Sequence, residues 1–371
     1  MTGGFAVGAQ TPAADTTIKI TFGGFVDEYY AWVFGRPPQF DRSFNGGALF
    51  TTQPARHDEF NVNLAFVGMK LEAERMRGRF ALQAGTSVES NYIGEPTIGL
   101  ISGPSLSRMI QEAVVGVRFA EGAWVDAGIF YSHVGMEGWV SGDNPTYTRS
   151  LVADYSPYYQ SGVKFTWTGT PKLTAQIDLV NGWQNISENN TGKGVGIRID
   201  YATSPSTTVS YYNIFSDESG NLPRTFNGIG AKATVGRVLL LGNVDVGTQI
   251  LPVAVTQSPP VDEHDRATWW GFTAIGRVTL TPTVALAMRV ERFDDPSQVV
   301  VVTGTAPDSI ANSPFRGYGA SLGIDWAIQP RIVWRSEVRG FNNNTRVFPN
   351  GLSITGRKGD GFIVTALTVS F

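Results

Sequence analysis

Charged and apolar side chains alternate along the segment 331–342. Odd positions carry the charged side chains Arg331, Arg335, Glu337 and Arg339. Successive side chains of a β-strand point to opposite faces, so this pattern predicts a strand with one charged and one apolar face. Opposed acids and bases beside water create a transverse field that orients polar solutes, which is the chemistry this row could supply.

Other segments carry charges with the same alternation. The further candidate residues for a water-filled lumen are Arg289, Glu291, Arg277, Asp325, Arg77, Arg79, Glu112, Arg118 and Arg198. An Arg or Lys on the lipid face at the middle of a bilayer costs about 2–4 kcal/mol, so in a membrane protein these faces must border water. Taken over all strands, the charged faces have a small basic excess and predict weak anion preference. For any one of these residues, the alternative is a salt bridge that only braces the wall.

The chain ends on an alternating segment that closes with an aromatic residue. Leu367, Val369 and Phe371 share one face, and Ala366, Thr368 and Ser370 share the other. A soluble protein rarely leaves an unpaired edge and an apolar ring at its end. A closed barrel in a membrane has no edge, and the ring can lie at the interface. This ending resembles the terminal signature of bacterial outer-membrane proteins, which implies that the assembly machinery of that membrane recognises Phe371.

The segments that would position these residues have the length of membrane strands. Sixteen are predicted: 17–33, 58–73, 76–90, 108–119, 123–133, 158–167, 172–183, 193–202, 206–216, 225–235, 238–250, 267–280, 283–293, 315–328, 331–342 and 360–371. Long and short connections alternate between them. This organisation predicts an all-β fold, a transmembrane antiparallel up-and-down β-barrel with short periplasmic turns, long extracellular loops and both termini in the periplasm. Fourteen or eighteen strands remain alternatives.

Aromatic residues recur near one end of the apolar strand faces. The predicted aromatic girdle comprises Phe119, Trp167, Tyr201, Trp326 and Phe371. Such rings are typical of strand ends at membrane interfaces. The alternative is that aromatic residues simply favour strands.

Composition limits the remaining function classes. The 371 residues include no cysteine and carry a net charge of −3, which argues against thiol chemistry and against a nucleic-acid partner. The sequence contains no run of 18 apolar residues, so it predicts no membrane-spanning helix. We interpret 1–16 as a leader remnant or disordered segment and 17–371 as a single barrel domain.

Two long loops carry apolar residues that would be unfavourable in water. In 91–107 they include Ile98 and Leu100, and in 134–157 they include Leu151 and Tyr155. A wall of sixteen strands leaves an aqueous channel, which such a loop can narrow. We predict that 134–157 folds inward, with two helical turns near Thr148 to Tyr155, and presents constriction-loop candidates to solutes. These candidates are Glu137, Arg149 and Asp154. The alternative is packing above the rim or a subunit contact.

The sequence favours no enzymatic chemistry. Its three histidines are His57, His133 and His264, and adjacent Ser132 and His133 would face opposite ways on a strand. No recognised hydrolase, phosphate-loop or calcium-binding motif is present. We therefore predict no catalytic residue, no metal site and no cofactor.

Three stretches in the middle of the chain resemble a family of outer-membrane porins called OmpL-like. They begin at Trp124-Val125-Asp126, at Tyr147-Thr148-Arg149 and at Asn181-Gly182-Trp183. The resemblance covers roughly 110–190, and it implies a bacterial outer-membrane location and a pore without identifying a substrate.

The sequence thus predicts passive diffusion of small hydrophilic solutes through a water-filled lumen. The expected partners are these solutes, outer-membrane lipid and lipopolysaccharide, the assembly machinery, and further copies in a homo-trimer. A structural or adhesive barrel whose lumen is plugged by its loops is the second interpretation. An outer-membrane enzyme is a third and weaker one.

Overall fold

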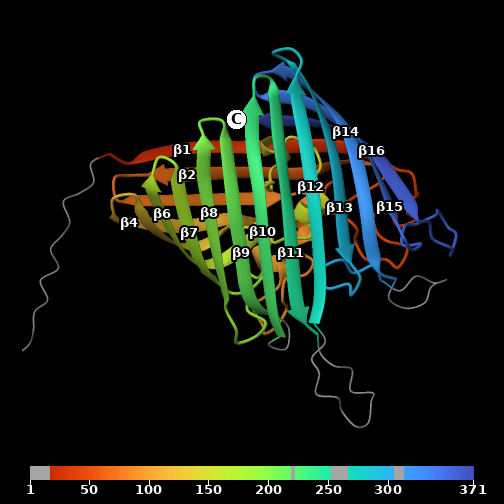
Figure 1. The fold of residues 1–371 in the computed structure, drawn as a ribbon, viewed down its shortest axis with the longest axis horizontal. Helices are drawn as coiled ribbons and strands as arrows, with labels where there is room; N and C mark the ends of the chain where they lie inside the picture. The colour runs from red at the N-terminus through yellow and green to blue at the C-terminus, as the bar shows by residue number, and fades with distance from the viewer. Residues whose placement is uncertain (1–16, 219–221, 252–265, 305–312) are drawn as a thin grey trace, which may run out of the picture.

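A computed structural model describes residues 17–218, 222–251, 266–304 and 313–371. Sixteen strands form one closed barrel, in which every strand pairs antiparallel with its neighbours in the chain (Figure 1). β1 (Lys19–Val33) closes the barrel against β16 (Gly359–Ser370). The predicted all-β, sixteen-strand barrel is confirmed. Among the described residues, no helix combines the length and apolar character needed to cross a bilayer.

The remaining strands follow the predicted order. They are β2 (Phe60–Glu72), β3 (Met76–Ala84), β4 (Ile110–Ala120), β5 (Ala123–Tyr131), β6 (Tyr159–Thr170), β7 (Leu173–Val180), β8 (Gly194–Ser204), β9 (Thr207–Glu218), β10 (Leu222–Val235), β11 (Val238–Ile250), β12 (Arg266–Thr279), β13 (Val284–Asp295), β14 (Phe315–Gln329) and β15 (Ile332–Asn343). Most boundaries lie within three residues of those expected from alternation. Short turns join strands at one end of the barrel and long loops join them at the other.

The register agrees with the alternation in the sequence. Asp325 on β14 pairs with Arg335 on β15, and both side chains are buried toward the lumen. The adjacent pair in the register, Trp326 and Trp334, is exposed on the outer wall. A shift of one residue would turn the charges toward lipid, so the period of two fixes this register.

One predicted strand is too long. The segment 76–90 leaves the sheet after Ala84, and Thr86–Asn91 forms helix α1. Gly85 has φ +136°, and a Cβ at this position would collide with the carbonyl oxygen of Asn63. The backbone therefore turns inward at this glycine, and Val88 on α1 is buried. Alternation alone did not distinguish this short helix from a strand end.

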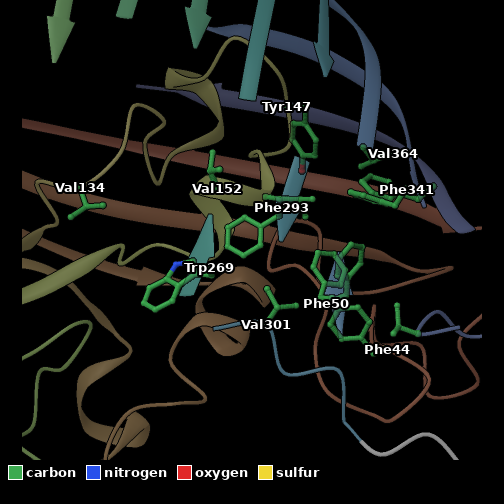
Figure 2. Packing of buried hydrophobic residues seen from close by; sticks show 14 of the residues in the cluster. Phe44, Phe50, Val134, Tyr147, Val152, Trp269, Phe293, Val301, Phe341 and Val364 are labelled. Atoms are coloured by element: carbon green, nitrogen blue, oxygen red, sulfur yellow. The ribbon is translucent and has the colours of Figure 1, made fainter. Parts of the chain in front are cut away.

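Several long loops contribute apolar side chains to the interior of the barrel. Phe44 and Phe50 from the β1–β2 loop lie near Phe341 of β15 (Figure 2). Both also pack against Phe348 of the β15–β16 loop. The ring centroids of Phe50 and Phe341 are 4.7 Å apart, and those of Phe50 and Phe348 are 5.1 Å apart. Aromatic packing at such distances stabilises the loops against the wall. The end of the lumen next to the long loops is therefore packed with side chains.

Candidate functional site

Residues 134–157, here called the inward loop, connect β5 to β6 and lie inside the barrel. Their side chains and backbone contact walls as far apart as β1, β3 and β13. The loop contains a 3-10 turn (Ser141–Asp143) and one short helix, α3 (Leu151–Asp154), whose N-cap is Ser150. The predicted inward folding is present. The predicted helix is shorter than two turns because Thr148 and Arg149 are engaged by other groups.

Arginines of the wall bind backbone carbonyls of the inward loop. Arg335 Nη2 donates to the oxygen of Asn144 at 3.1 Å, and Arg335 also donates to the oxygen of Ser141. Arg277 donates to the oxygen of Pro145 at 3.1 Å. Charge-assisted hydrogen bonds of this kind are stronger than neutral ones. They fasten the middle of the loop to β12 and β15.

Thr148 is the most densely bonded residue of the loop. Its backbone nitrogen donates to Glu337 at 2.8 Å, and its hydroxyl donates to the same carboxylate at 2.9 Å. Arg289 donates to the carbonyl oxygen of Thr148 at 2.6 Å and to its hydroxyl at 2.8 Å. Arg339 adds a bond to the hydroxyl at 3.2 Å. Wall residues of β13 and β15 thereby hold one loop residue from several directions.

The same wall residues form a buried ladder of ion pairs. Arg289 contacts Glu337 at 2.8 Å, and Arg339 contacts Glu291 at 2.8 Å, with all four side chains fully buried. Glu291 also accepts from the backbone nitrogen of Leu151 at 2.6 Å. Buried ion pairs are costly unless every charge is paired and hydrogen-bonded. The inward loop supplies the partners that complete this ladder.

This burial corrects part of the predicted site. Arg289, Glu291, Arg335, Glu337 and Arg339 lie on the inward face as predicted, but the inward loop covers them. The expectation that they meet passing solute is wrong in this structure because these side chains are buried and bonded to loop and wall groups. These side chains hold the inward loop in place.

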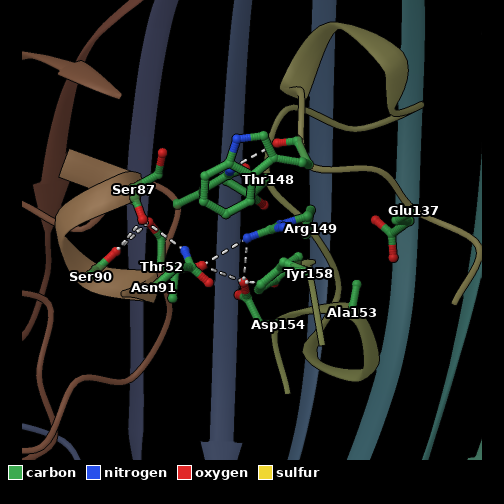
Figure 3. Close-up of polar contacts among 12 residues, drawn as sticks. Thr52, Ser87, Ser90, Asn91, Glu137, Thr148, Arg149, Ala153, Asp154 and Tyr158 are labelled. Atoms are coloured by element: carbon green, nitrogen blue, oxygen red, sulfur yellow. Dashed lines mark hydrogen bonds and ion pairs between the residues drawn. The ribbon is translucent and has the colours of Figure 1, made fainter. Parts of the chain in front are cut away.

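Two of the three constriction-loop candidates, Arg149 and Asp154, are also buried. Arg149 is fully buried, and its guanidinium lies over the ring of Tyr158 at 3.4 Å. It donates to Thr52 at 2.9 Å and to Asp154 at 3.4 Å (Figure 3). Glu137 is half-buried and accepts from the backbone nitrogen of Ser150 at 3.2 Å. The expected presentation of Arg149 and Asp154 to solute is wrong because these groups pair with each other and with a neighbouring loop.

Asp27 on β1 is an anchor that the sequence analysis missed. Its carboxylate accepts from the hydroxyls of Ser141 at 2.8 Å and Tyr147 at 2.9 Å, and from Asn63 at 2.8 Å. The signal was present in the sequence, because Asp27 shares its parity with the inward residues Phe25 and Tyr29. No pattern in the sequence identified its loop partners.

His133 forms a second missed contact, at the start of the inward loop. Its Nδ1 lies 2.6 Å from Asp178, and its Nε2 lies 2.7 Å from the carbonyl oxygen of Asn213. Arg198, a predicted lumen residue, donates to the oxygens of His133 and Gly135, each at 2.8 Å. The point at which the loop leaves β5 is therefore fixed to β7, β8 and β9.

Other predicted lumen residues stay open to the interior at the short-turn end. Arg77 pairs with Asp126, and the exposed fractions of the two side chains are 35% and 4%. Arg79 pairs with Glu112, with 38% and 9% exposed. In both pairs the guanidinium is the exposed partner. Their role in lining a pore remains a prediction.

Two predicted residues lie at the rim. Arg118, near the end of β4, reaches Glu74 of the β2–β3 turn at 3.2 Å. Arg331 lies in the turn between β14 and β15 and is exposed. Arg331 is therefore not part of the strand row formed by Arg335 and Arg339, because the strand begins one residue later.

The predicted girdle residues occupy comparable positions. All five are exposed, and each lies at or near the short-turn end of its strand or at the chain terminus: Phe119, Trp167, Tyr201, Trp326 and Phe371. Their contact with a membrane interface remains a prediction.

The other candidate loop behaves differently from the inward loop. Ile98, Leu100 and Ile101, at 63%, 102% and 86% exposed, do not pack against the wall. The loop 91–107 was a candidate for narrowing the lumen, and the structure leaves these three apolar side chains exposed. Within the described parts of the chain, no group of three or more potential ligand side chains could hold a metal ion.

The fold and the charged interior define a transmembrane β-barrel channel with a loop folded into its lumen. The sequence matches the family model described as "Putative beta-barrel porin-2, OmpL-like" over residues 19–371, and the chain belongs to this family. It is an outer-membrane porin, a channel for passive diffusion. The resemblance recognised in the middle of the sequence is thus confirmed over the whole barrel.

Solved structures share this fold at low sequence identity. The anion-selective porin from Comamonas acidovorans is similar with a TM-score of 0.60 and 10% identity, over 96% of this chain and 100% of that one. OmpF of Salmonella typhi gives 0.58 and 13%, over 95% and 97%. DcaP of Acinetobacter baumannii gives 0.58 and 10%, over 95% and 97%. Comparison with curated proteins finds no similar sequence.

Proposed function

We propose that this porin passes small hydrophilic solutes around the inward loop with weak anion preference. The observation that carries the preference is the unequal exposure within wall ion pairs. In the pairs Arg77–Asp126 and Arg79–Glu112, and also in the pair of Arg277 with Asp325, the base is the more exposed partner. In these three pairs the basic partner presents more surface to water, whereas in the pair Arg198–Asp200 the carboxylate does, at 30% against 22%. We therefore expect only a weak excess of accessible positive charge, and pores select by such charge.

Single-channel recording in a planar bilayer tests this proposal. With a KCl gradient across the bilayer, we expect steady openings and a reversal potential of the sign that indicates chloride preference. A reversal potential that indicates potassium preference would contradict the charge assignment while leaving the channel intact. The anion-selective porin from Comamonas acidovorans, which shares the fold, supports the same direction.

A second candidate is a structural or adhesive barrel, and one observation favours it. The inward loop and the aromatic cluster of Phe44, Phe50, Phe341 and Phe348 fill much of the lumen. A correctly folded protein that stays silent at all voltages would favour this candidate over passive diffusion.

We further propose a homo-trimer. The apolar residues Ile98, Leu100 and Ile101 of one loop are exposed, and their side chains would gain by burial in a subunit contact. OmpT of Vibrio cholerae, which shares the fold at a TM-score of 0.58 and 8% identity over 95% of this chain and 99% of that one, is described in a trimer form. Light scattering on detergent-solubilised protein tests the state. Leu100→Asp should shift a trimer toward monomers, and an unchanged monomer mass in both proteins would contradict it.

The remaining proposals concern the membrane environment. The termini would lie in the periplasm, residues 1–16 would be a leader remnant outside the described residues, and 17–371 would form a single domain. Outer-membrane lipid and lipopolysaccharide would surround the wall, and the assembly machinery would recognise Phe371.

We also propose that the protein lacks catalytic activity, which release of labelled fatty acid from a lipid substrate would contradict.

A further inference from the structure

A small pocket lies under the inward loop at the short-turn end of the lumen. Its volume is about 240 Å³, and residues 142–145 of the loop form one side of it. The wall contributes residues from β10 to β16, among them Lys232, Arg277, Asp325 and Val333. Drug-sized ligands occupy pockets of roughly 300–1,000 Å³, so this pocket suits a smaller molecule.

The charge of the pocket favours an anion. Three cations, Lys232, Arg277 and Arg335, face two carboxylates, Asp325 and Asp143. Asp325 is shared by two of these cations, since it accepts from Arg335 Nε at 2.9 Å and is ion-paired with Arg277. Among the described residues, no hydrogen bond or ion pair involves the ammonium of Lys232, which is exposed. Lys232 is therefore the cation that remains available to a ligand.

Two aliphatic side chains of the wall also line the pocket. Leu239 and Val333 border the pocket, and the hydroxyl of Thr368 is engaged with the carbonyl oxygen of Val333 at 3.2 Å. An inorganic ion would leave the two aliphatic side chains without a partner. A ligand with a carboxylate and a compact hydrocarbon body would satisfy both the cation and the apolar side.

We propose that this pocket binds small organic carboxylates, with Lys232 as the residue that contacts the carboxylate. The inference rests on the proposed anion preference of the lumen and names a solute class and a place for it. Arg277 lines the same pocket and donates to Pro145 at 3.1 Å. A bound carboxylate would thus lie beside the attachment of the inward loop and could compete for its arginine.

Calorimetric titration of the purified, detergent-folded full chain with sodium benzoate tests the site. We expect saturable binding by the wild type and about tenfold weaker binding by Lys232→Met, the effect of losing one charge-assisted contact. Lys70→Met is the matched control, because Lys70 carries the same charge on the inner face of β2 and is ion-paired with Glu72 at 2.7 Å. It should bind benzoate as the wild type does.

Benzamide, which has the same ring without the charge, should not bind measurably. Equal binding of benzamide and benzoate, or unchanged benzoate binding by Lys232→Met, would overturn the proposal. Lys232→Gln provides a second variant, and heat-modifiable migration on gels verifies that each variant is folded. If the protein conducts but does not bind benzoate, the pocket assignment fails while the passive channel stands. If it binds benzoate but is silent in a bilayer, the channel proposal fails while the pocket stands.

Discussion

Arg289 on β13 holds Thr148 of the inward loop by two hydrogen bonds, at 2.6 Å to its carbonyl oxygen and 2.8 Å to its hydroxyl. The hydroxyl also contacts Glu337 and Arg339, so one loop oxygen joins three buried charged groups. The position of the loop therefore depends on Thr148, a residue that the alternation in the sequence does not single out.

Replacing Thr148 by Val should release the inward loop. The β-branched shape is kept, but the hydroxyl contacts of Arg289, Glu337 and Arg339 are lost. Leaving buried charged groups without a partner costs about 1–3 kcal/mol or more. We expect larger or noisier single-channel openings than in the wild type. Thr148→Ser keeps the hydroxyl and should conduct normally, and identical recordings from both variants would contradict this role.

Arg79 and Glu112 should affect ion selectivity in opposite directions. Arg79→Gln removes the exposed member of the pair and should lower anion preference, whereas Glu112→Gln leaves the guanidinium uncompensated and should raise it. Reversal potentials in KCl gradients measure both. The two shifts should be largest near 0.1 M salt and should shrink toward 1 M, where the Debye length falls from about 10 Å to about 3 Å. Shifts of the same sign in both variants would contradict the assignment.

The β1–β2 loop should loosen under acidic conditions through His57. Its Nδ1 accepts a hydrogen bond from the backbone nitrogen of Val33 at 3.0 Å, and burial lowers the pKa of the imidazole. The folded state therefore binds a proton less readily than the unfolded chain, and stability falls as the pH drops below the ordinary pKa of about 6.5. Hydrogen exchange of residues 34–59 should increase between pH 7.5 and pH 5, after correction for intrinsic rates.

His57→Asn provides the control for this pH effect. An asparagine side chain can still accept a hydrogen bond but does not titrate in this range. The variant should show a smaller pH dependence of exchange in residues 34–59. An equally large dependence in the variant would assign it to another group.

Phe371 should matter more for assembly than for the stability of the finished barrel. Its backbone pairs with Gly24, with nitrogen–oxygen distances of 3.0 and 3.1 Å, and its ring is 59% exposed. Because the ring is only partly buried, Phe371→Ala should reduce the unfolding free energy by about 1 kcal/mol. We expect a much larger loss of folded protein in bacterial outer membranes, measured by heat-modifiable migration.

Phe371→Tyr retains the ring and should assemble normally. If Phe371→Ala accumulates to the wild-type level, recognition of the terminal ring by the assembly machinery is contradicted. A parallel refolding experiment in detergent separates this effect from intrinsic stability.

The sequence by itself determined the barrel and the inward face of its wall. Alternation along 315–328 and 331–342 is a local property of each strand, and a one-residue shift would place Arg335 and Arg339 in lipid. Strand number, connection lengths and the inward charges could therefore be predicted without a structure. The strand end at Ala84 could not, because the turn at Gly85 depends on the backbone of Asn63.

Only the tertiary structure decided which inward charges meet water. Arg289 and Arg79 both occupy inward positions on alternating strands, yet one is fully buried and the other is 38% exposed. The difference arises because the inward loop returns across the lumen and places Thr148 against β13 and β15. Such contacts join residues more than 140 positions apart, and the periodicity of a strand contains no information about them.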